Sequence, residues 1–277
     1  MARAIPLTSL RRSLPKPVAR RRTGWIFIIP SLVMIVLFAL PLLALILRAA
    51  GSDFLISIAA PSALQALRVS LVTSTLSLCV TLLCGTPLAY LLARSQFPLK
   101  PWLETLIDLP IVLPPSVAGI ALLMAFGRNG MVGPSLSLLG IHLPFTTAAV
   151  VMAQTFVSGP LYIRAARIGF TDVDVQLEEA ATVEGANAWQ LFREVMIPLA
   201  GTALLNGAIL CWARALGEFG ATILFAGNLE GVTQTMPLAV YIGLERDLAI
   251  ALALSVMLVA VSILLLTSAR RLERRED

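Results

Sequence analysis

The sequence predicts an all-α membrane protein with six transmembrane helices, a cytoplasmic helix-turn-helix loop, and both chain ends in the cytoplasm. The first observation behind this prediction is composition. Of the 277 residues, 58% are hydrophobic and the mean hydropathy is +0.88, far from the composition of soluble domains. The second is that charged residues, only 13% of the chain, gather between long apolar runs. The third is the uneven distribution of Lys and Arg over the connecting segments, which sets the orientation of a membrane protein.

The first 23 residues are basic, contain three prolines and precede an apolar run from Gly24 to Leu47. This run is too long for the apolar region of a signal peptide, and no small-residue cleavage site follows it. A helix needs roughly 20 apolar residues to cross the hydrocarbon layer, so the run is expected to be the first span. Further spans are expected at about 69–93, 104–126, 145–165, 199–225 and 248–268.

The predicted transmembrane domain therefore covers 24–268, between a cytoplasmic N-terminal segment (1–23) and a cytoplasmic tail (269–277). With this orientation the cytoplasmic segments carry sixteen Lys and Arg residues and the outer segments carry four. Such a bias places the loop between the fourth and fifth spans, about 166–198, in the cytoplasm. It also accounts for the net charge of +5, so no nucleic acid partner is expected.

The loop at 166–198 begins with a predicted short helix. Asp172 and Asp174 offer carboxylates that can cap a helix start. Leu177, Ala180 and Ala181 then fall on one helical face, and the two alanines on that face would let another backbone come close.

A glycine turn and a second helix are expected to follow. Gly185 stands where a helix would end in a left-handed turn. Asn187, with Gln190 three residues later, is typical of a capping-box start. The loop is therefore expected to be helix, turn, helix, and the alternative is an ordinary solvated connection.

The same residues resemble the cytoplasmic loop of ABC importer permeases, whose pattern is E-A-A, three residues, G, nine residues, and I-x-L-P. Here Glu179-Ala180-Ala181 leads after three residues to Gly185 and after nine more to Val195-Met196-Ile197-Pro198. The departures, Val for Ile and Ile for Leu, keep size and polarity. The resemblance implies that this coupling loop docks into a groove on a separate ATPase subunit. ATPase coupling is accordingly assigned to Leu177, Glu179, Ala180, Ala181, Gly185 and Pro198.

Three prolines interrupt the third expected span. Pro110, Pro114 and Pro115 fall within six residues and leave backbone carbonyls without their helical partners. Such a break is tolerated at membrane depth only against protein or a water-filled cavity. One interpretation is a translocation-pathway element that includes Pro114, Pro115, Ser116 and Gly119. The other is a packing kink in a helix surrounded by protein.

The fifth expected span carries two ionisable residues, Arg214 and Glu218, one helical turn apart. Ionisable groups within spans are costly and usually face a bundle interior or a cavity. A structural ion pair and a role in the translocation pathway both remain open for them. Gly217 and Gly220 would allow close helix approach or a local break.

Catalysis within the chain is not expected. The three cysteines, Cys79, Cys84 and Cys211, lie in apolar runs without a CxxC spacing, and His142 is the single histidine. These residues offer no metal site and no nucleophile. No G-x-x-x-x-G-K-[ST] phosphate loop is present, so no cofactor is assigned to this chain and the driving force must come from a partner.

Residues 65–268 as a whole are similar to the molybdate permease subgroup, and sulfate and tungstate permeases share much of the pattern. The similarity rests on the Leu-Pro-Pro stretch at 113–115, the segment 214–222, and Gln-Thr-Met-Pro-Leu at 234–238. It implies an inner-membrane homodimer, two cytoplasmic ABC ATPase subunits that carry ATP and Mg²⁺, and an extracytoplasmic protein that delivers the oxyanion. The alternatives are a secondary transporter or channel acting alone, and a membrane anchor for a signalling complex. The absence of an evident inverted repeat weakens the secondary-transporter reading.

Overall fold

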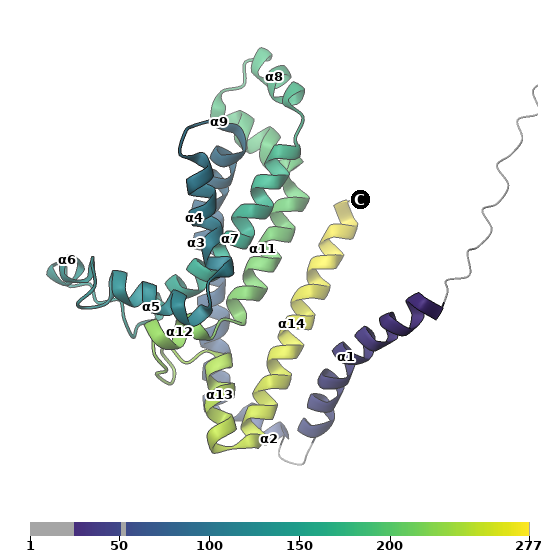
Figure 1. Cartoon of the computed structure of the whole chain (residues 1–277), viewed down its shortest axis with the longest axis vertical. Coiled ribbons are helices and arrows are strands. Elements are labelled where there is room, and N and C mark those ends of the chain that lie inside the picture. Colours follow the sequence, from purple (N-terminus) through teal and green to yellow (C-terminus); the bar gives the residue numbers. More distant parts are fainter. Residues whose placement is uncertain (1–24, 51–53, 277) are drawn as a thin grey trace, which may run out of the picture. The chain divides into compact units, whose positions relative to one another are not determined.

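The computed structural model describes residues 25–50 and 54–276, and among these residues it contains helices, turns and loops but no strand (Figure 1). The all-α prediction is thereby confirmed. The expected cytoplasmic segment 1–23 lies outside the described residues. The chain divides into two units, one ending at Leu47 and one starting at Arg48, and each is described by itself.

The first unit contains helix α1 (Trp25–Ala49) as far as Leu47, and this helix matches the first expected span. Its apolar stretch from Phe27 to Ala49 has a mean hydropathy of 2.7. Such a helix is long and apolar enough to cross a bilayer.

The second unit is built around α3 (Pro61–Arg94), α7 (Thr147–Asp172) and α11 (Gly201–Leu216), which pack against one another (Figure 1). Short side chains line their contacts, so the backbones approach closely. Thr155 of α7 donates a hydrogen bond to Ser77 of α3 at 3.0 Å. The buried hydroxyl side chains of α3 are Ser70, Thr73, Ser74, Ser77 and Thr81.

Three of the described helices, α1, α3 and α14 (Leu248–Glu276), contain stretches long and apolar enough to span a membrane. Two bent helix pairs raise this number to five if each pair is one span. The expected span at 145–165 corresponds to α7, which is not among them. Polar residues such as Gln154 and Ser158 lower the hydropathy of this helix, and both are buried among neighbouring helices. The count of six spans is therefore not confirmed by length and composition.

The third expected span, 104–126, is interrupted, as its three prolines predicted. The helices α4 (Lys100–Val112) and α5 (Pro115–Phe126) meet at an angle of 120°. The chain turns at Leu113, whose backbone is extended (φ −64°, ψ 136°), because the proline that follows disfavours the helical conformation.

The expected helix at 199–225 is also divided. The chain leaves the helical path after Leu216 and resumes in α12 (Gly220–Phe225). The glycines at 217 and 220 therefore mark a local break, one of the two possibilities that the sequence left open. Helix α12 packs against α5, so the two interrupted regions lie side by side (Figure 1).

The remaining helices are short connections and one further packed element. Helix α13 was not predicted, and it packs on α14. Its start carries Pro237, a residue typical of first helical turns, so the signal was present in the sequence. The bounds are α2 (Phe54–Ala59), α6 (Gly133–Leu138), α8 (Val175–Val183), α9 (Ala188–Gln190), the π-helix η2 (Leu191–Met196), α10 (Ile197–Leu199) and α13 (Met236–Arg246).

Candidate functional site

The connection between α7 and α11 begins with α8, the first helix of the predicted pair. Asp174 caps it, because its carboxylate accepts the N–H of Gln176 at 2.9 Å. An anionic cap satisfies a free backbone donor and lies at the favourable end of the helix dipole. Asp172, the other expected cap, is instead the last residue of α7.

Gly185 ends α8 in the left-handed conformation that the sequence predicted, with φ +94°. Its N–H donates to the carbonyl of Thr182, and the N–H of Ala186 donates to the carbonyl of Ala181, both at 3.0 Å. These two bonds form a Schellman motif. No atom lies within 4 Å of the position that a Cβ would take, so the glycine is required by the backbone and not by lack of space.

The second helix starts with the expected capping box. The Asn187 side chain accepts the N–H groups of Trp189 and Gln190 at 3.0 Å, and the Gln190 side chain accepts the N–H of Asn187 at 2.9 Å. The helical path then continues from α9 through η2 and α10, and bends by 74° into α11. No local sequence signal predicted the π-helical turn.

Helix α8 presents an open surface, since none of its residues is buried. Of the six residues predicted to couple, Ala181 is half-buried and the other five are exposed. Apolar side chains are exposed beside them, with Val183 at 88% and Trp189 at 64%. A partly apolar exposed surface on an otherwise polar segment is typical of an interaction site.

Aromatic side chains hold the second helix of the connection on the bundle. Phe192 of η2 lies 5.0 Å from Tyr90 of α3 and 6.2 Å from Phe170 of α7, measured between ring centroids. Tyr90 and Phe170 themselves meet edge to face at 5.6 Å. Such contacts are favourable beyond the burial of area, so this helix end is anchored to both long helices.

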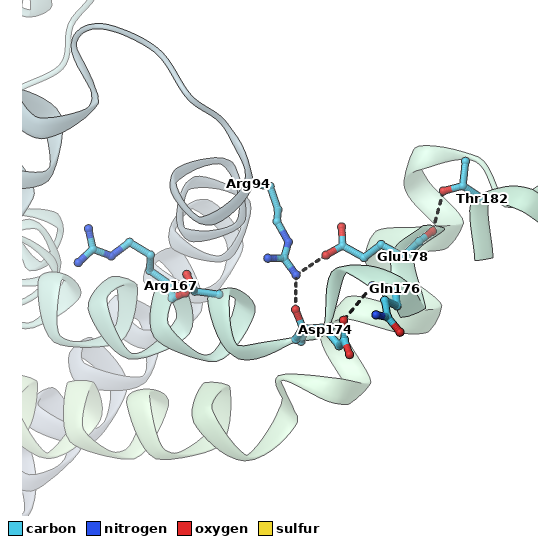
Figure 2. A network of polar contacts seen from close by, with 8 residues as sticks. Arg94, Arg167, Asp174, Gln176, Glu178 and Thr182 are labelled. Atoms are coloured by element: carbon cyan, nitrogen blue, oxygen red, sulfur yellow. Dashed lines mark hydrogen bonds and ion pairs between the residues drawn. The ribbon is translucent and has the colours of Figure 1, made fainter. Parts of the chain in front are cut away.

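Helix α8 is attached in a different way, through charge. Figure 2 shows Arg94, the last residue of α3, in an ion pair with Glu178 of α8. The same guanidinium donates a hydrogen bond to the carbonyl of Val173 at 2.9 Å. The sequence did not predict a role for Arg94 or Glu178. Arg94 is 79 positions from Val173 in the chain, and it had been used only in the count of Lys and Arg that predicts membrane orientation.

The predicted pathway residues of α5 divide into two groups. Pro114, Pro115 and Ser116 are exposed at the start of the helix, while Gly119 is buried. A Cβ at Gly119 would lie 2.9 Å from the carbonyl oxygen of Ala221, so this glycine permits the close contact with α12. A role in the pathway stays a prediction for all four residues.

Arg214 and Glu218 form the expected ion pair, at 2.7 Å, across the break that follows α11. The Glu218 side chain is only 1% exposed, and that of Arg214 is 35% exposed. The other carboxylate oxygen of Glu218 accepts the N–H of Ala221 at 2.8 Å. Glu218 therefore joins the end of α11 to the first turn of α12, while the guanidinium keeps one side open.

Within the described part of the chain, no group of three or more His, Cys, Asp or Glu side chains could hold a metal ion. The three cysteines are free, and Cys211 is buried with its thiol near the hydroxyl of Ser158, at 3.4 Å. His142 lies on an exposed loop, 3.5 Å from Ser137.

Comparison with known proteins adds four findings. Residues 85–277 match the family model described as "Binding-protein-dependent transport system inner membrane component". The chain is 42% identical over 240 residues to the molybdenum transport system permease protein ModB of Mycobacterium tuberculosis, covering 87% of this chain and 90% of the relative. It is 37% identical over 254 residues to the probable transport system permease protein NifC of Clostridium pasteurianum, covering 91% and 88%. A chain of the crystal structure of the bacterial alginate ABC transporter shares the fold, with a TM-score of 0.76 at 17% identity over 91% of this chain and 93% of that one.

Proposed function

Because the chain belongs to the family of binding-protein-dependent transport system inner membrane components, we propose that it is the permease subunit of an ATP-driven ABC importer that moves an oxyanion, molybdate, into the cytoplasm. As a member of this family it is a transport protein of the inner membrane. Molybdate is supported by the relatives that carry molybdenum transport in their names. Sulfate and tungstate are also tetrahedral dianions and are the competing cargoes.

One observation carries the proposal: the connection between α7 and α11 has the form expected of a coupling loop. An Asp-capped helix, a Schellman turn at Gly185 and a capping box at Asn187 fix its backbone, and they coincide with the E-A-A…G pattern. The exposed residues around Ala181 include Leu177, Ala180 and Val183, which are small or apolar. This surface suits a groove on a separate ATPase subunit, which would bind ATP and Mg²⁺.

In the proposed complex, two copies of the chain form the pathway and two ATPase subunits bind the coupling loops. An extracytoplasmic binding protein delivers the oxyanion. This chain contributes movement and charge. The coupling loop moves when the ATPases close, and the partly exposed Arg214 offers positive charge to a dianion. The Glu218 carboxylate moderates that charge, so the ion would not be trapped.

The proposed topology has six spans, with α7 as the fourth and both termini in the cytoplasm. It is supported by the distribution of Lys and Arg. A reporter fused after Asp277, or within 180–190, is expected to report the cytoplasm. A reporter near Gly130 or Gly231 is expected to report the outside. An outside signal from the 180–190 fusion would remove the basis for ATPase docking.

The function is tested by purifying the chain with its partner ATPase and binding protein, and reconstituting them in liposomes. Molybdate is expected to stimulate ATP hydrolysis and to accumulate inside the vesicles. Sulfate and tungstate are measured in the same assay, and stronger stimulation by either one reassigns the cargo. Uptake that persists without any ATPase would instead support a secondary transporter or channel.

A further inference from the structure

Arg94 occupies a single point where three separate parts of the chain meet. It closes the last turn of α3, donates to the carbonyl of Val173 at 2.9 Å, and forms the ion pair with Glu178 (Figure 2). Val173 lies between α7 and α8, and Glu178 lies in the first turn of α8. The guanidinium of Arg94 therefore connects the end of α3 to α8, which is the coupling helix, and to Val173, which is the hinge between α7 and α8.

The electrostatic surroundings favour both charges at these positions. A cation at the end of α3 faces the negative end of that helix dipole, and an anion in the first turn of α8 faces a positive end. The two side chains are 18% and 15% exposed, so water screens the pair less than it would on an open surface. The planar guanidinium of an arginine can donate to two acceptors at once in a fixed geometry. The ammonium group of a lysine would hold the same two acceptors less rigidly.

The attachment matters because little else fixes α8 on the bundle. None of its nine residues is buried, so apolar packing contributes little to its position. The aromatic cluster of Tyr90, Phe170 and Phe192 anchors the second helix of the loop and not α8. Within the described residues, the ion pair of Arg94 is the one that reaches α8 from another helix.

We propose that Arg94 is a positioning residue that makes α8 and α3 move together, so that displacement of the coupling helix by an ATPase reaches the transmembrane core. This inference rests on the proposed function. Because α3 packs along α7 and α11, a pull on its end is transmitted to the centre of the bundle. Without the interactions of Arg94, α8 would still dock on the ATPase, but the chain would bend at Val173 and the movement of α8 would not reach α3.

The chain offers a matched control in a second ion pair. Arg167 of α7 contacts Glu104 of α4 at 2.6 Å, with side chains 27% and 28% exposed. This pair also joins two helices and includes an arginine, yet it does not touch α8. Arg167→Gln therefore removes a comparable interaction without releasing the coupling helix.

The first experiment measures molybdate uptake and ATP hydrolysis in the reconstituted complex. Arg94→Gln is expected to keep ATP hydrolysis while the molybdate taken up per ATP falls about fivefold or more, the lower range of coupling between distant sites. Arg167→Gln is expected to keep the ratio of the unaltered protein. Glu178→Gln, which leaves the bond to Val173 intact, should give an intermediate ratio, and it serves if Arg94→Gln does not assemble. An unchanged ratio in Arg94→Gln, or a proportional loss of both rates, would overturn the proposal.

The second experiment measures position directly and does not depend on the cargo. Spin labels are placed at Val183 of α8 and at Leu99, both exposed, after the three native cysteines are replaced by alanine. The distance distribution is expected to broaden in Arg94→Gln and to stay narrow in Arg167→Gln. An equally narrow distribution in Arg94→Gln rejects the link even if transport is impaired. If no oxyanion stimulates the unaltered complex, the proposed function fails while this measurement still decides whether Arg94 holds α8.

Discussion

Replacing Arg214 by glutamine removes the positive partner of a carboxylate that is almost fully buried. Glu218 is 1% exposed, so its charge would be left without compensation, at a cost of about 3–5 kcal/mol. Replacing Glu218 by glutamine has a smaller expected effect. Arg214 is 35% exposed and can be hydrated, and the amide oxygen can still accept the N–H of Ala221. The loss is then that of a hydrogen bond to a charged group, about 1.5–3 kcal/mol.

The burial of the two side chains thus predicts an order of stability. Arg214→Gln should be less stable than Glu218→Gln by about 2 kcal/mol, the difference between the two central values. For a protein of this size that corresponds to a melting temperature lower by roughly 4–8 °C. Thermal unfolding of the purified variants in detergent, followed by tryptophan fluorescence, measures the difference. The reverse order, with Glu218→Gln the less stable, would refute the assignment of the carboxylate as the buried member.

The double variant separates structure from transport. With glutamine at both positions, no charge is left without a partner, so assembly and melting temperature should recover relative to Arg214→Gln. A pathway role predicts that oxyanion uptake nevertheless stays low, because the positive charge is gone. Full recovery of uptake would show that Arg214 and Glu218 serve the break between α11 and α12 alone.

Four further outcomes are expected from substitutions in the coupling loop and in α5. Ala181→Trp should reduce co-purification with the ATPase and uptake while the chain still reaches the membrane, and an intact complex with normal stimulated ATPase would contradict docking at α8. Gly185→Ala should destabilise the coupling loop by about 1–2 kcal/mol, because a Cβ is strained at φ +94°, and protease sensitivity of the loop measures it. Ser116→Cys should react with a small hydrophilic thiol reagent at a rate that changes when ATP is trapped on the partner. Gly119→Cys should instead lower stability, since its Cβ meets Ala221 and Leu224 at 2.9 Å, and a reactive, stable Gly119→Cys would contradict the buried contact.

Local signals in the sequence were sufficient for the coupling loop. Caps and turns are set by residues within about five positions, so Asp174, Gly185 and Asn187 predicted helix ends that the structure confirms. The prolines at 114 and 115 likewise predicted a break, although not its angle of 120°. That angle depends on the packing of α5 against α12, which local sequence does not determine.

Contacts between distant parts of the chain could not be predicted. The link from Arg94 to Glu178 depends on where α3 ends relative to α8, which only the packed bundle defines. The divided helix after Leu216 was only one of two open possibilities, for a related reason. Two glycines permit a break without requiring it, and the burial of Glu218, which stabilises the break, depends on the packed bundle.

The polar composition of α7 has a consequence for biosynthesis. A helix that carries Gln154 in its first half and Arg164 and Arg167 in its second half partitions poorly into lipid on its own. Its neighbours in the folded bundle are α3, made earlier, and α11, made later. In the proposed six-span topology, integration of α7 should therefore wait until α3 has been made, and hydroxyl side chains of α3 such as Ser77 would bind α7 while it is still being synthesised. Replacing the buried hydroxyl residues of α3 by leucine would make α3 more lipid-soluble, but it would remove the polar contacts that α7 needs for its own integration.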